Sequence, residues 1–229
     1  MKTIGLIGGM SWESTATYYQ LLNEAVKERL GGLHSAPILL YSFDFAPIEA
    51  LQSAGDWEAC ARLLSEAGQK LEKAGADLLL ICTNTQHKVA DQVQDSVTIP
   101  LLHIADATAE ELLARGIRKA ALLGTKYTMT QDFYRGRLER AGVETLIPSP
   151  QDVDLVNHII FDQLCLGIFD SASRSQLIRI MDGLSAQGAQ GIILGCTELG
   201  LLIRPEDTLL PLFDTTQIHA ARAAALAME

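Results

Sequence analysis

The amino-acid sequence predicts an α/β fold made of two similar domains, each with a small parallel sheet flanked by helices. Short apolar runs alternate along the chain with segments whose apolar residues recur at helical spacing, a pattern typical of βαβ units. These runs do not alternate with polar residues, which indicates strands buried on both faces. The clearest run occurs twice, at residues 75–85 and again at residues 188–198.

Each copy of this repeated stretch consists of a Gly-Ala turn, an apolar run and a few small polar residues. The copies lie 113 positions apart, so Thr83 in the first stands where Cys196 stands in the second. Ligand sites of open parallel sheets lie at the carboxyl ends of the strands. We therefore expect the polar residues of both copies to bind one small molecule in a cleft between two domains.

The segments around the two copies also echo one another in order. In the first half, strands are expected at residues 3–7, 37–45 and 97–102, and helices at residues 11–30, 56–74 and from residue 86. In the second half, strands are expected at residues 120–125, 143–147 and 210–216, and helices at residues 130–141, 153–168 and 173–187. An internal duplication explains this order, with the two halves related by a pseudo-twofold axis. We expect one domain of residues 1–98 and 210–229 and a second of residues 99–209, with crossings near Ile99 and Leu210.

The composition argues against some classes of function. The 229 residues carry a net charge of −10, which argues against a nucleic-acid-binding or polybasic membrane-binding surface. An acidic substrate must therefore be held by local donors. No stretch has the length of a membrane span or of a signal h-region, so a cytoplasmic protein is expected. Its four cysteines have no C-x-x-C spacing and are expected to be free thiols.

A Gly-Gly turn at Gly8 and Gly9 joins the first strand to the first helix, for which Ser11 and Ser14 offer N-caps. The turn lacks the later glycines of the nucleotide-binding fingerprint. Two interpretations remain open. The turn forms a backbone amide pocket for an anion at a helix N-terminus, or it serves only as a tight connection between strand and helix.

Five segments together resemble the aspartate/glutamate racemase family, and within it the amino-acid racemases rather than the glutamate racemases of wall synthesis. They are Gly-Leu-Ile-Gly-Gly-Met-Ser-Trp-Glu-Ser-Thr at residues 5–15, Asn-Thr-Gln-His at 84–87, Leu-Gly-Thr at 123–125, Leu-Gly-Cys-Thr-Glu at 194–198 and Phe-Asp-Thr-Thr at 213–216. The resemblance implies an enzyme without a cofactor, whose site lies between two similar domains and takes a thiol from each. It also suggests a homodimer.

The first motif departs from the family's Cys-Asn-Thr, because Thr83 stands where the resemblance places the first catalytic cysteine, one residue after Cys82. Consecutive strand residues point to opposite faces, so Cys82 is expected in the core unless a bulge turns its sulfur toward the site. A thiolate can act as a base because donors and helix N-termini lower its pKa. The resemblance assigns the L-enantiomer to the second cysteine. Cys196 would therefore deprotonate an L-amino acid, while Thr83, a poor base, would assist reprotonation.

Seven further residues are expected to bind the substrate, together with backbone amides after Gly8 and Gly124. They are Met10, Gln52, Asn84, Thr85, Thr125, Thr197 and Glu198. Glu198 either orients Cys196 and shares its proton, or favours a helix N-terminus as a carboxylate. Residues 46–53 and 164–167, where family members carry a basic residue, have none. L-Aspartate and L-glutamate are the expected substrates, and a neutral side chain such as that of homoserine remains an alternative.

Two other functions stay open: a single-cysteine decarboxylase or isomerase of small dicarboxylates, and a binding module without catalysis. His87 would form only a poor zinc site with Cys82 and is assigned to the start of a helix. His103 and His219 are assigned to capping or packing. The expected partner is a small amino-acid substrate, with no nucleic acid, membrane, metal or cofactor.

Overall fold

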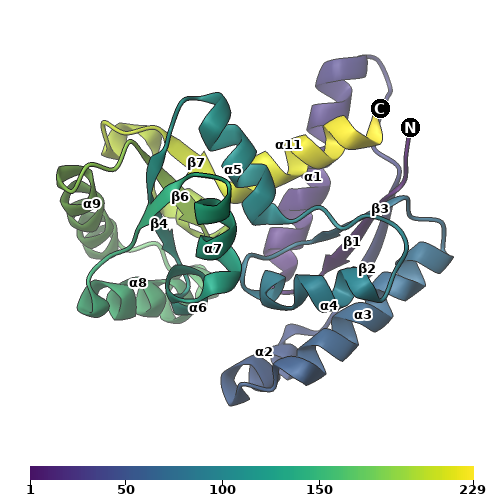
Figure 1. The fold of residues 1–229 in the computed structure, drawn as a ribbon, viewed down its shortest axis with the longest axis horizontal. Coiled ribbons are helices and arrows are strands. Elements are labelled where there is room, and N and C mark those ends of the chain that lie inside the picture. The colour runs from purple at the N-terminus through teal and green to yellow at the C-terminus, as the bar shows by residue number, and fades with distance from the viewer. The chain divides into compact units, whose positions relative to one another are not determined.

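The computed structural model describes residues 1–229, which form two compact units. The first contains Met1–Ile104 and His219–Glu229, and the second contains Ala105–Ile218. Each unit has one parallel sheet flanked by helices, and Figure 1 traces both units along the chain from purple to yellow. The α/β architecture predicted from the sequence is confirmed. No helix combines the length and the apolar character needed to cross a membrane.

Three parallel strands form the first sheet, in the order β2-β1-β3. They are β1 (Ile4–Gly8), β2 (Ile38–Ser42) and β3 (Leu78–Ile81). β1 and β3 are buried along their whole length, as their uninterrupted apolar residues predict. Leu101 adds a single parallel bridge beside Leu79 of β3.

Helices cover both faces of this sheet (Figure 1). The helical segments are α1 (Trp12–Leu30), α2 (Phe45–Ala54), α3 (Trp57–Lys73), the 3₁₀ turn η1 (Thr85–Val89), α4 (Ala90–Asp95) and the second part of α11 (Thr215–Ala227). On one face, apolar residues of α3 and α4 form a core with Leu79 and Ile81. On the other face, α1 and α11 pack against Leu78 and Leu80. Alternate residues of β3 thus face opposite helix layers.

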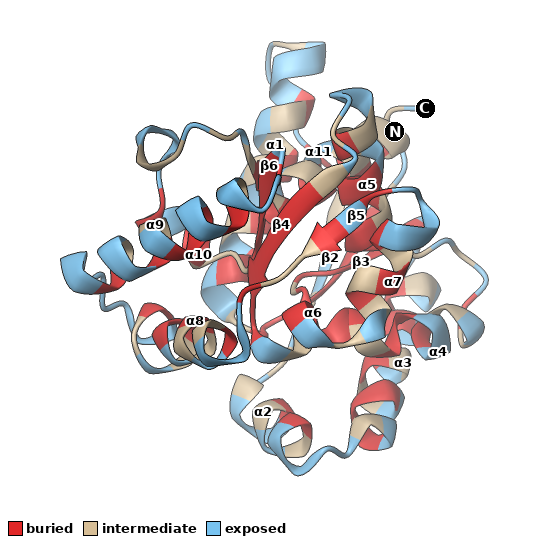
Figure 2. Cartoon of the chain, turned by 60° about the vertical axis from the view of Figure 1, so that its left-hand side comes forward, coloured by how far each residue is buried: buried red, intermediate tan, exposed pale blue.

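The second sheet contains four parallel strands in the order β5-β4-β6-β7. They are β4 (Lys119–Gly124), β5 (Glu144–Leu146), β6 (Gly191–Gly195) and β7 (Leu212–Asp214). The helical segments along this part of the chain are α5 (Ile104–Ala114), α6 (Lys126–Thr130), α7 (Asp132–Arg140), α8 (Pro150–Asp162), η2 (Leu164–Leu166), α9 (Ser171–Ala186), α10 (Leu199–Leu202) and η3 (Pro205–Asp207). Figure 2 shows β4 as a buried strand, and it shows α8 and α9 with both buried and exposed residues.

The two sheets share one topology. β1 lies between β2 and β3, as β4 lies between β5 and β6. The bridge at Leu101 takes the place beside β3 that β7 takes beside β6. This equivalence supports the internal duplication predicted from the repeated stretch.

The strand expected at residues 97–102 is reduced to the bridge at Leu101. Pro100 has no N–H to donate, but its carbonyl accepts from the Leu79 N–H, and the Leu102 N–H donates to the Leu79 carbonyl. These bonds tie residues 100–102 to the first unit. β7 pairs with β6 and so belongs to the second unit. Both crossings between the units therefore fall later than residues 99 and 210.

Three expected helices also differ in detail. The helix expected at residues 130–141 is two helices, α6 and α7, separated by Gln131 in an extended conformation. The helix expected at residues 153–168 is α8 followed by η2, and the helix expected from residue 86 opens with the 3₁₀ turn η1.

The Gly-Gly turn of the first unit is a tight connection between β1 and α1. Ser11 caps α1 by accepting a hydrogen bond from the Ser14 N–H. Gly9 has a φ of +87°, and its N–H donates to Thr15 Oγ1 at 2.8 Å. The amide directly after Gly8 is thus used within the fold.

Candidate functional site

Cys82 and Thr83 follow β3, at the carboxyl end of the first sheet, and have different surroundings. Cys82 is fully buried in the apolar core that α1 and α11 form on their face of the sheet, and this burial raises the pKa of its thiol. Its N–H donates to the Ile7 carbonyl at 2.9 Å. Thr83 is half-buried. The prediction that Cys82 is a core residue is confirmed.

A buried histidine holds the turn that carries Thr83. His87 Nδ1 lies 2.7 Å from the Thr83 carbonyl oxygen, and its Nε2 accepts a hydrogen bond from the Ile104 N–H at 3.2 Å. An N–H only donates and a carbonyl only accepts, so the ring is the neutral tautomer with its hydrogen on Nδ1. Both ring nitrogens of His87 are therefore engaged with the backbone.

The other residues predicted near the first strand end are buried. Asn84 and Thr85 follow in the same turn. Gln52 on α2 accepts a hydrogen bond from Gln86 Nε2 at 3.1 Å, although the sequence predicted no role for Gln86. Met10 lies in the apolar core that α3 and α4 form with the sheet. The structure thus brings Gln52 and Gln86 together and surrounds Met10 with apolar side chains.

Cys196 follows β6 and lies beside a carboxylate. It is half-buried, and its thiol donates a hydrogen bond to Glu198, with Sγ 2.9 Å from Oε2. Burial raises the pKa of the Cys196 thiol well above its ordinary value, and the charge of Glu198 raises it further. Burial and the neighbouring carboxylate thus both favour the protonated thiol over the thiolate. The pKa of Cys196 moves in the opposite direction to that expected for a thiolate base, because the group beside it is a hydrogen-bond acceptor with a negative charge.

Two roles were considered for the Glu198 side chain, contact with the Cys196 thiol and capping of a helix N-terminus. The structure shows the contact with the thiol. Glu198 immediately precedes α10, but its side chain makes no capping hydrogen bond to that helix. The carboxylate instead accepts from Cys196. A thiol and a proton acceptor are thus in direct contact at the carboxyl end of β6.

Threonine hydroxyls connect the end of β6 with the start of α11. Thr197 Oγ1 lies 3.2 Å from Thr216 Oγ1, and Thr215 Oγ1 donates to a backbone carbonyl of β6 at 3.0 Å. The sequence predicted no role for Thr215 and Thr216. They end the stretch expected as a strand at residues 210–216, and a place at the carboxyl end of a parallel strand is a signal that could have found them. Thr125 instead caps α6, where its hydroxyl accepts from the Thr128 N–H at 3.3 Å.

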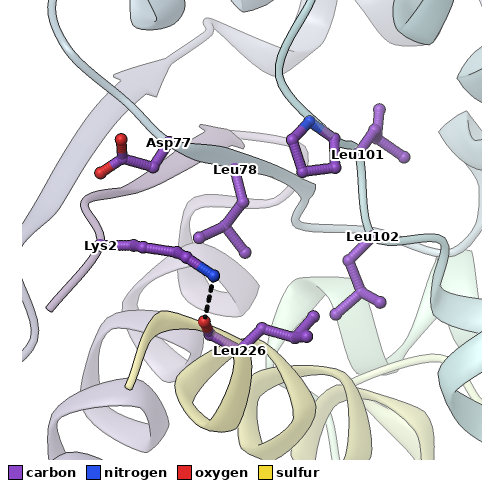
Figure 3. Close-up of a pocket in the computed structure, with 7 residues that line it drawn as sticks. Lys2, Asp77, Leu78, Leu101, Leu102 and Leu226 are labelled. Carbon is purple, nitrogen blue, oxygen red and sulfur yellow. Dashed lines mark hydrogen bonds between the residues drawn. The ribbon is translucent and has the colours of Figure 1, made fainter. Parts of the chain in front are cut away.

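The first unit also contains a cavity of about 480 Å³ at the opposite, amino-terminal end of β3 (Figure 3). The lining residues are Lys2, Asp77, Leu78, Pro100, Leu101, Leu102 and Leu226. The two charged residues take part in the fold, because Lys2 Nζ donates to the Leu226 carbonyl at 3.1 Å and Asp77 Oδ2 accepts from the Thr3 N–H at 2.6 Å. None of the residues predicted to bind the substrate lines this cavity.

Comparison with known proteins identifies the family. The sequence profile of the Asp/Glu/hydantoin racemases matches residues 7–223. The chain belongs to the Asp/Glu/hydantoin racemase family. The resemblance carried by the five sequence segments is thereby confirmed.

Two solved structures and one curated protein are similar to this chain over nearly its whole length. A candidate Asp/Glu racemase from Yersinia pestis is 55% identical, with a TM-score of 0.95 over the full length of both chains. An aspartate racemase homologue from Pyrococcus horikoshii OT3 is 40% identical, with a TM-score of 0.87, again over both full chains. The broad specificity amino-acid racemase RacX of Bacillus subtilis (strain 168) is 24% identical over 218 residues, which cover 93% of this chain and 92% of RacX. The protein is thus an amino-acid racemase of this family.

Proposed function

We propose that this racemase acts on L-aspartate or L-glutamate without a cofactor, with Cys196 as the group that removes the Cα proton. The observation that carries the proposal is the 2.9 Å hydrogen bond from the Cys196 thiol to Glu198. A thiol in contact with a carboxylate can pass its proton to that carboxylate and then accept a proton from the substrate. Thr83, at the equivalent strand end of the first unit, assists the return of a proton to the other face of the carbanion.

The proposed steps balance in protons. Cys196 Sγ–H transfers its proton to Glu198, and the resulting thiolate takes the Cα proton of the L-amino acid. The carbanion then receives a proton on its opposite face from the Thr83 hydroxyl, which a water molecule reprotonates. Glu198 returns its proton to the hydroxide left by that water. The enzyme ends in its starting protonation state, and the net change is inversion at Cα.

The proposed reaction is directional, because the Thr83 hydroxyl and the Cys196 thiol differ in how readily they ionise. A threonine hydroxyl ionises far less readily than a thiol, so Thr83 is a poor base toward a D-amino acid. We therefore expect a slow enzyme that prefers L-enantiomers over their mirror images. Comparable turnover of both enantiomers in a chiral assay would contradict this expectation.

Polar groups at both strand ends would hold the substrate. Asn84, Thr85, Thr125 and Thr197 offer amide or hydroxyl donors to its carboxylates, and donors near the α-carboxylate would stabilise the charge that develops as the proton leaves. Met10 and Gln52 are proposed to contact the side chain of the substrate.

An amino acid with a neutral side chain is an alternative substrate. Residues 46–53 and 164–167 contain no Lys or Arg, and a second carboxylate is bound most strongly by a basic residue. L-Homoserine therefore belongs in the same assay as the two acidic substrates. The proposal further includes a homodimer and a cytoplasmic location, where Cys196 would stay reduced.

Proton NMR in heavy water tests the proposal. L-Aspartate, L-glutamate and L-homoserine are each incubated with the protein while the Cα–H signal is followed. The wild-type protein should replace this hydrogen with deuterium in at least one substrate, and Cys196→Ala should slow the exchange by about 10³-fold. Cys60→Ala, which removes a buried thiol from α3, should keep the wild-type rate. Retention of the signal with all three substrates would contradict the proposal.

A decarboxylase is a second candidate, because Cys196 is the one thiol at the two catalytic positions of the repeated stretch. A single thiol can protonate the carbanion that remains when carbon dioxide leaves a substituted malonate. The hydrogen bond that the Cys196 thiol donates to Glu198 favours the protonated form that this step requires. Carbon dioxide release from a substituted malonate, without Cα exchange in any amino acid, would favour this candidate.

A further inference from the structure

We propose that His87 is a positioning residue, which holds Thr83 where the threonine hydroxyl can protonate one face of the carbanion. This role depends on the proposed function and concerns a side chain that its proton steps do not use. His87 belongs to η1, four residues after Thr83. It acts on Thr83 through the backbone, not through the threonine hydroxyl.

The His87 ring connects two backbone segments of the first unit. Its Nδ1 lies 2.7 Å from the Thr83 carbonyl oxygen, and its Nε2 lies 3.2 Å from the Ile104 nitrogen. Ile104 begins α5 and is the residue after which the chain leaves the first unit. The ring therefore ties the turn that carries Thr83 to this exit segment.

Two further histidine rings lie close to His87. The His87 side chain is almost completely buried, and its ring lies 4.6 Å from that of His103 and 5.6 Å from that of His219, measured between centroids. His219 Nε2 donates to the Leu102 carbonyl at 2.9 Å, so its Nδ1 accepts from the Tyr18 hydroxyl at 2.8 Å. A proton added to His87 would displace the Ile104 N–H from Nε2.

Two hydrogen bonds from His87 close the turn at the end of β3. Besides the ring bond to Thr83, the His87 N–H donates to the Asn84 carbonyl at 3.1 Å. Fixing the Thr83 carbonyl restricts the backbone dihedral that sets the direction of its Cα–Cβ bond. A displacement of about 1 Å in a reacting group can cost about 10²-fold in rate, so this restriction has a measurable consequence.

Thr83 takes part in only one of the two proposed proton transfers. Exchange without inversion needs Cys196 and Glu198 alone, because the Cα proton leaves to the thiolate and a deuteron returns from the same side. Inversion also needs the Thr83 hydroxyl on the other face. The ratio of inversion to exchange therefore reports the placement of Thr83, whereas a general loss of structure lowers both rates together.

Two conservative variants separate the hydrogen bonds of His87. In His87→Asn the side-chain nitrogen can take the place of Nδ1 and donate to Thr83, but nothing accepts from Ile104. In His87→Gln the side-chain oxygen can reach the place of Nε2 and accept from Ile104, but the donor to Thr83 is lost. For each variant, the loss of the Cα–H signal of the L-substrate in heavy water and the formation of the D-product on a chiral column are measured together.

We expect His87→Gln to lower inversion relative to exchange by about tenfold to a hundredfold, and His87→Asn to keep the ratio within about threefold of wild type. His219→Gln is the matched control, because His219 is also buried and bonds a backbone carbonyl of the same unit. It should leave the ratio unchanged even where it lowers stability. An unchanged ratio in His87→Gln, or an equal loss of both rates, would overturn the inference.

A second measurement does not depend on activity. Long-range proton–nitrogen NMR distinguishes the two neutral tautomers of a histidine, and His87 should carry its hydrogen on Nδ1. A hydrogen on Nε2 would overturn the inference, because Nδ1 could then not donate to Thr83. Absence of both exchange and inversion in the wild type, with the expected tautomer present, would refute the proposed function and with it the positioning role.

Discussion

The two equivalent strand ends of this racemase hold their polar side chains by different means. After β3, Thr83 is held through its backbone carbonyl by the ring of a buried histidine, His87. After β6, Cys196 and Glu198 contact each other directly through their side chains. The duplicated scaffold keeps the position of the strand end, while the chemistry at that position differs.

This difference can be followed residue by residue. Thr83 and Thr85 in the first copy correspond to Cys196 and Glu198 in the second. The first pair offers two hydroxyls, neither of which ionises near neutral pH, whereas the second joins a thiol to a carboxylate that can take its proton. A pair of groups suited to removing a proton, Cys196 and Glu198, is therefore present in the second unit only. A symmetrical scaffold can in this way support a one-sided reaction.

The largest effect is expected from Thr83→Cys, which gives both strand ends the same reacting group. A thiol ionises more readily than a hydroxyl, so this variant should exchange the Cα proton of D-amino acids about 10²- to 10³-fold faster than wild type. The Cα–H signals of D-aspartate and D-glutamate in heavy water give the rate.

Thr83→Ser is the matched control for this experiment, because it keeps the hydroxyl and removes only a methyl group. D-Amino acids should exchange as slowly in this variant as in wild type. If Thr83→Cys exchanged them no faster than Thr83→Ser, the side chain at position 83 would not decide the direction of the reaction.

The order of strands and helices could be predicted because it depends on local patterns. Uninterrupted apolar runs identify β3 and β6, and Ser11 identifies the start of α1. The sequence does not predict α5, since its residues 104–109 alternate Ala with other residues and so lack the contrast between faces that marks an amphipathic helix. α2 was also missed, because it is short and has a proline near its start, which is usually taken as a sign of a turn.

The places of Thr83 and Cys196 at the ends of two equivalent strands could be predicted, but the surroundings that set the pKa of the thiol could not. The repeated stretch alone identifies Thr83 and Cys196 as equivalent. The raised pKa of Cys196 depends on burial and on the direction in which Glu198 points, and neither follows from spacing. The place of His87 likewise depends on Ile104, 17 residues away, whose N–H meets the ring only in the folded chain.

A smaller effect, on stability, is expected in the first unit from His219. Burial lowers the pKa of His219 to about 4 from its ordinary value of 6.5, so the unfolded chain takes up the proton first as the pH falls. The contribution of His219 to stability is therefore complete above pH 6.5 and is lost toward pH 4. At pH 5 the loss should be about 2 kcal/mol.

Urea unfolding at pH 7 and pH 5 measures this loss, and hydrogen exchange should locate it in the first unit. His219→Asn should reduce the difference between the two pH values. His158→Asn, at an exposed histidine on α8 of the second unit, is the control and should leave the difference as in wild type. An equal pH effect in the wild type and in His219→Asn would assign the loss to other groups.

The smallest effect is expected from Glu198→Gln, which tests whether the carboxylate is what distinguishes the second strand end. Two consequences oppose each other. Without the charge and the acceptor, the pKa of Cys196 should fall, although burial still holds it above its ordinary value. Without the carboxylate, however, no group takes the proton of the thiol, so Cα–H exchange at neutral pH should slow by about tenfold.

Alkylation of the peptide that contains Cys196, at increasing pH, follows the first of these consequences, and Cα–H exchange follows the second. Glu206→Gln removes an exposed carboxylate from η3 of the same unit and should change neither. Faster exchange in Glu198→Gln would mean that the carboxylate only suppresses the thiolate. The difference between the two strand ends would then lie in the sulfur of Cys196 alone, and Thr83→Cys would by itself be enough to make the reaction two-sided.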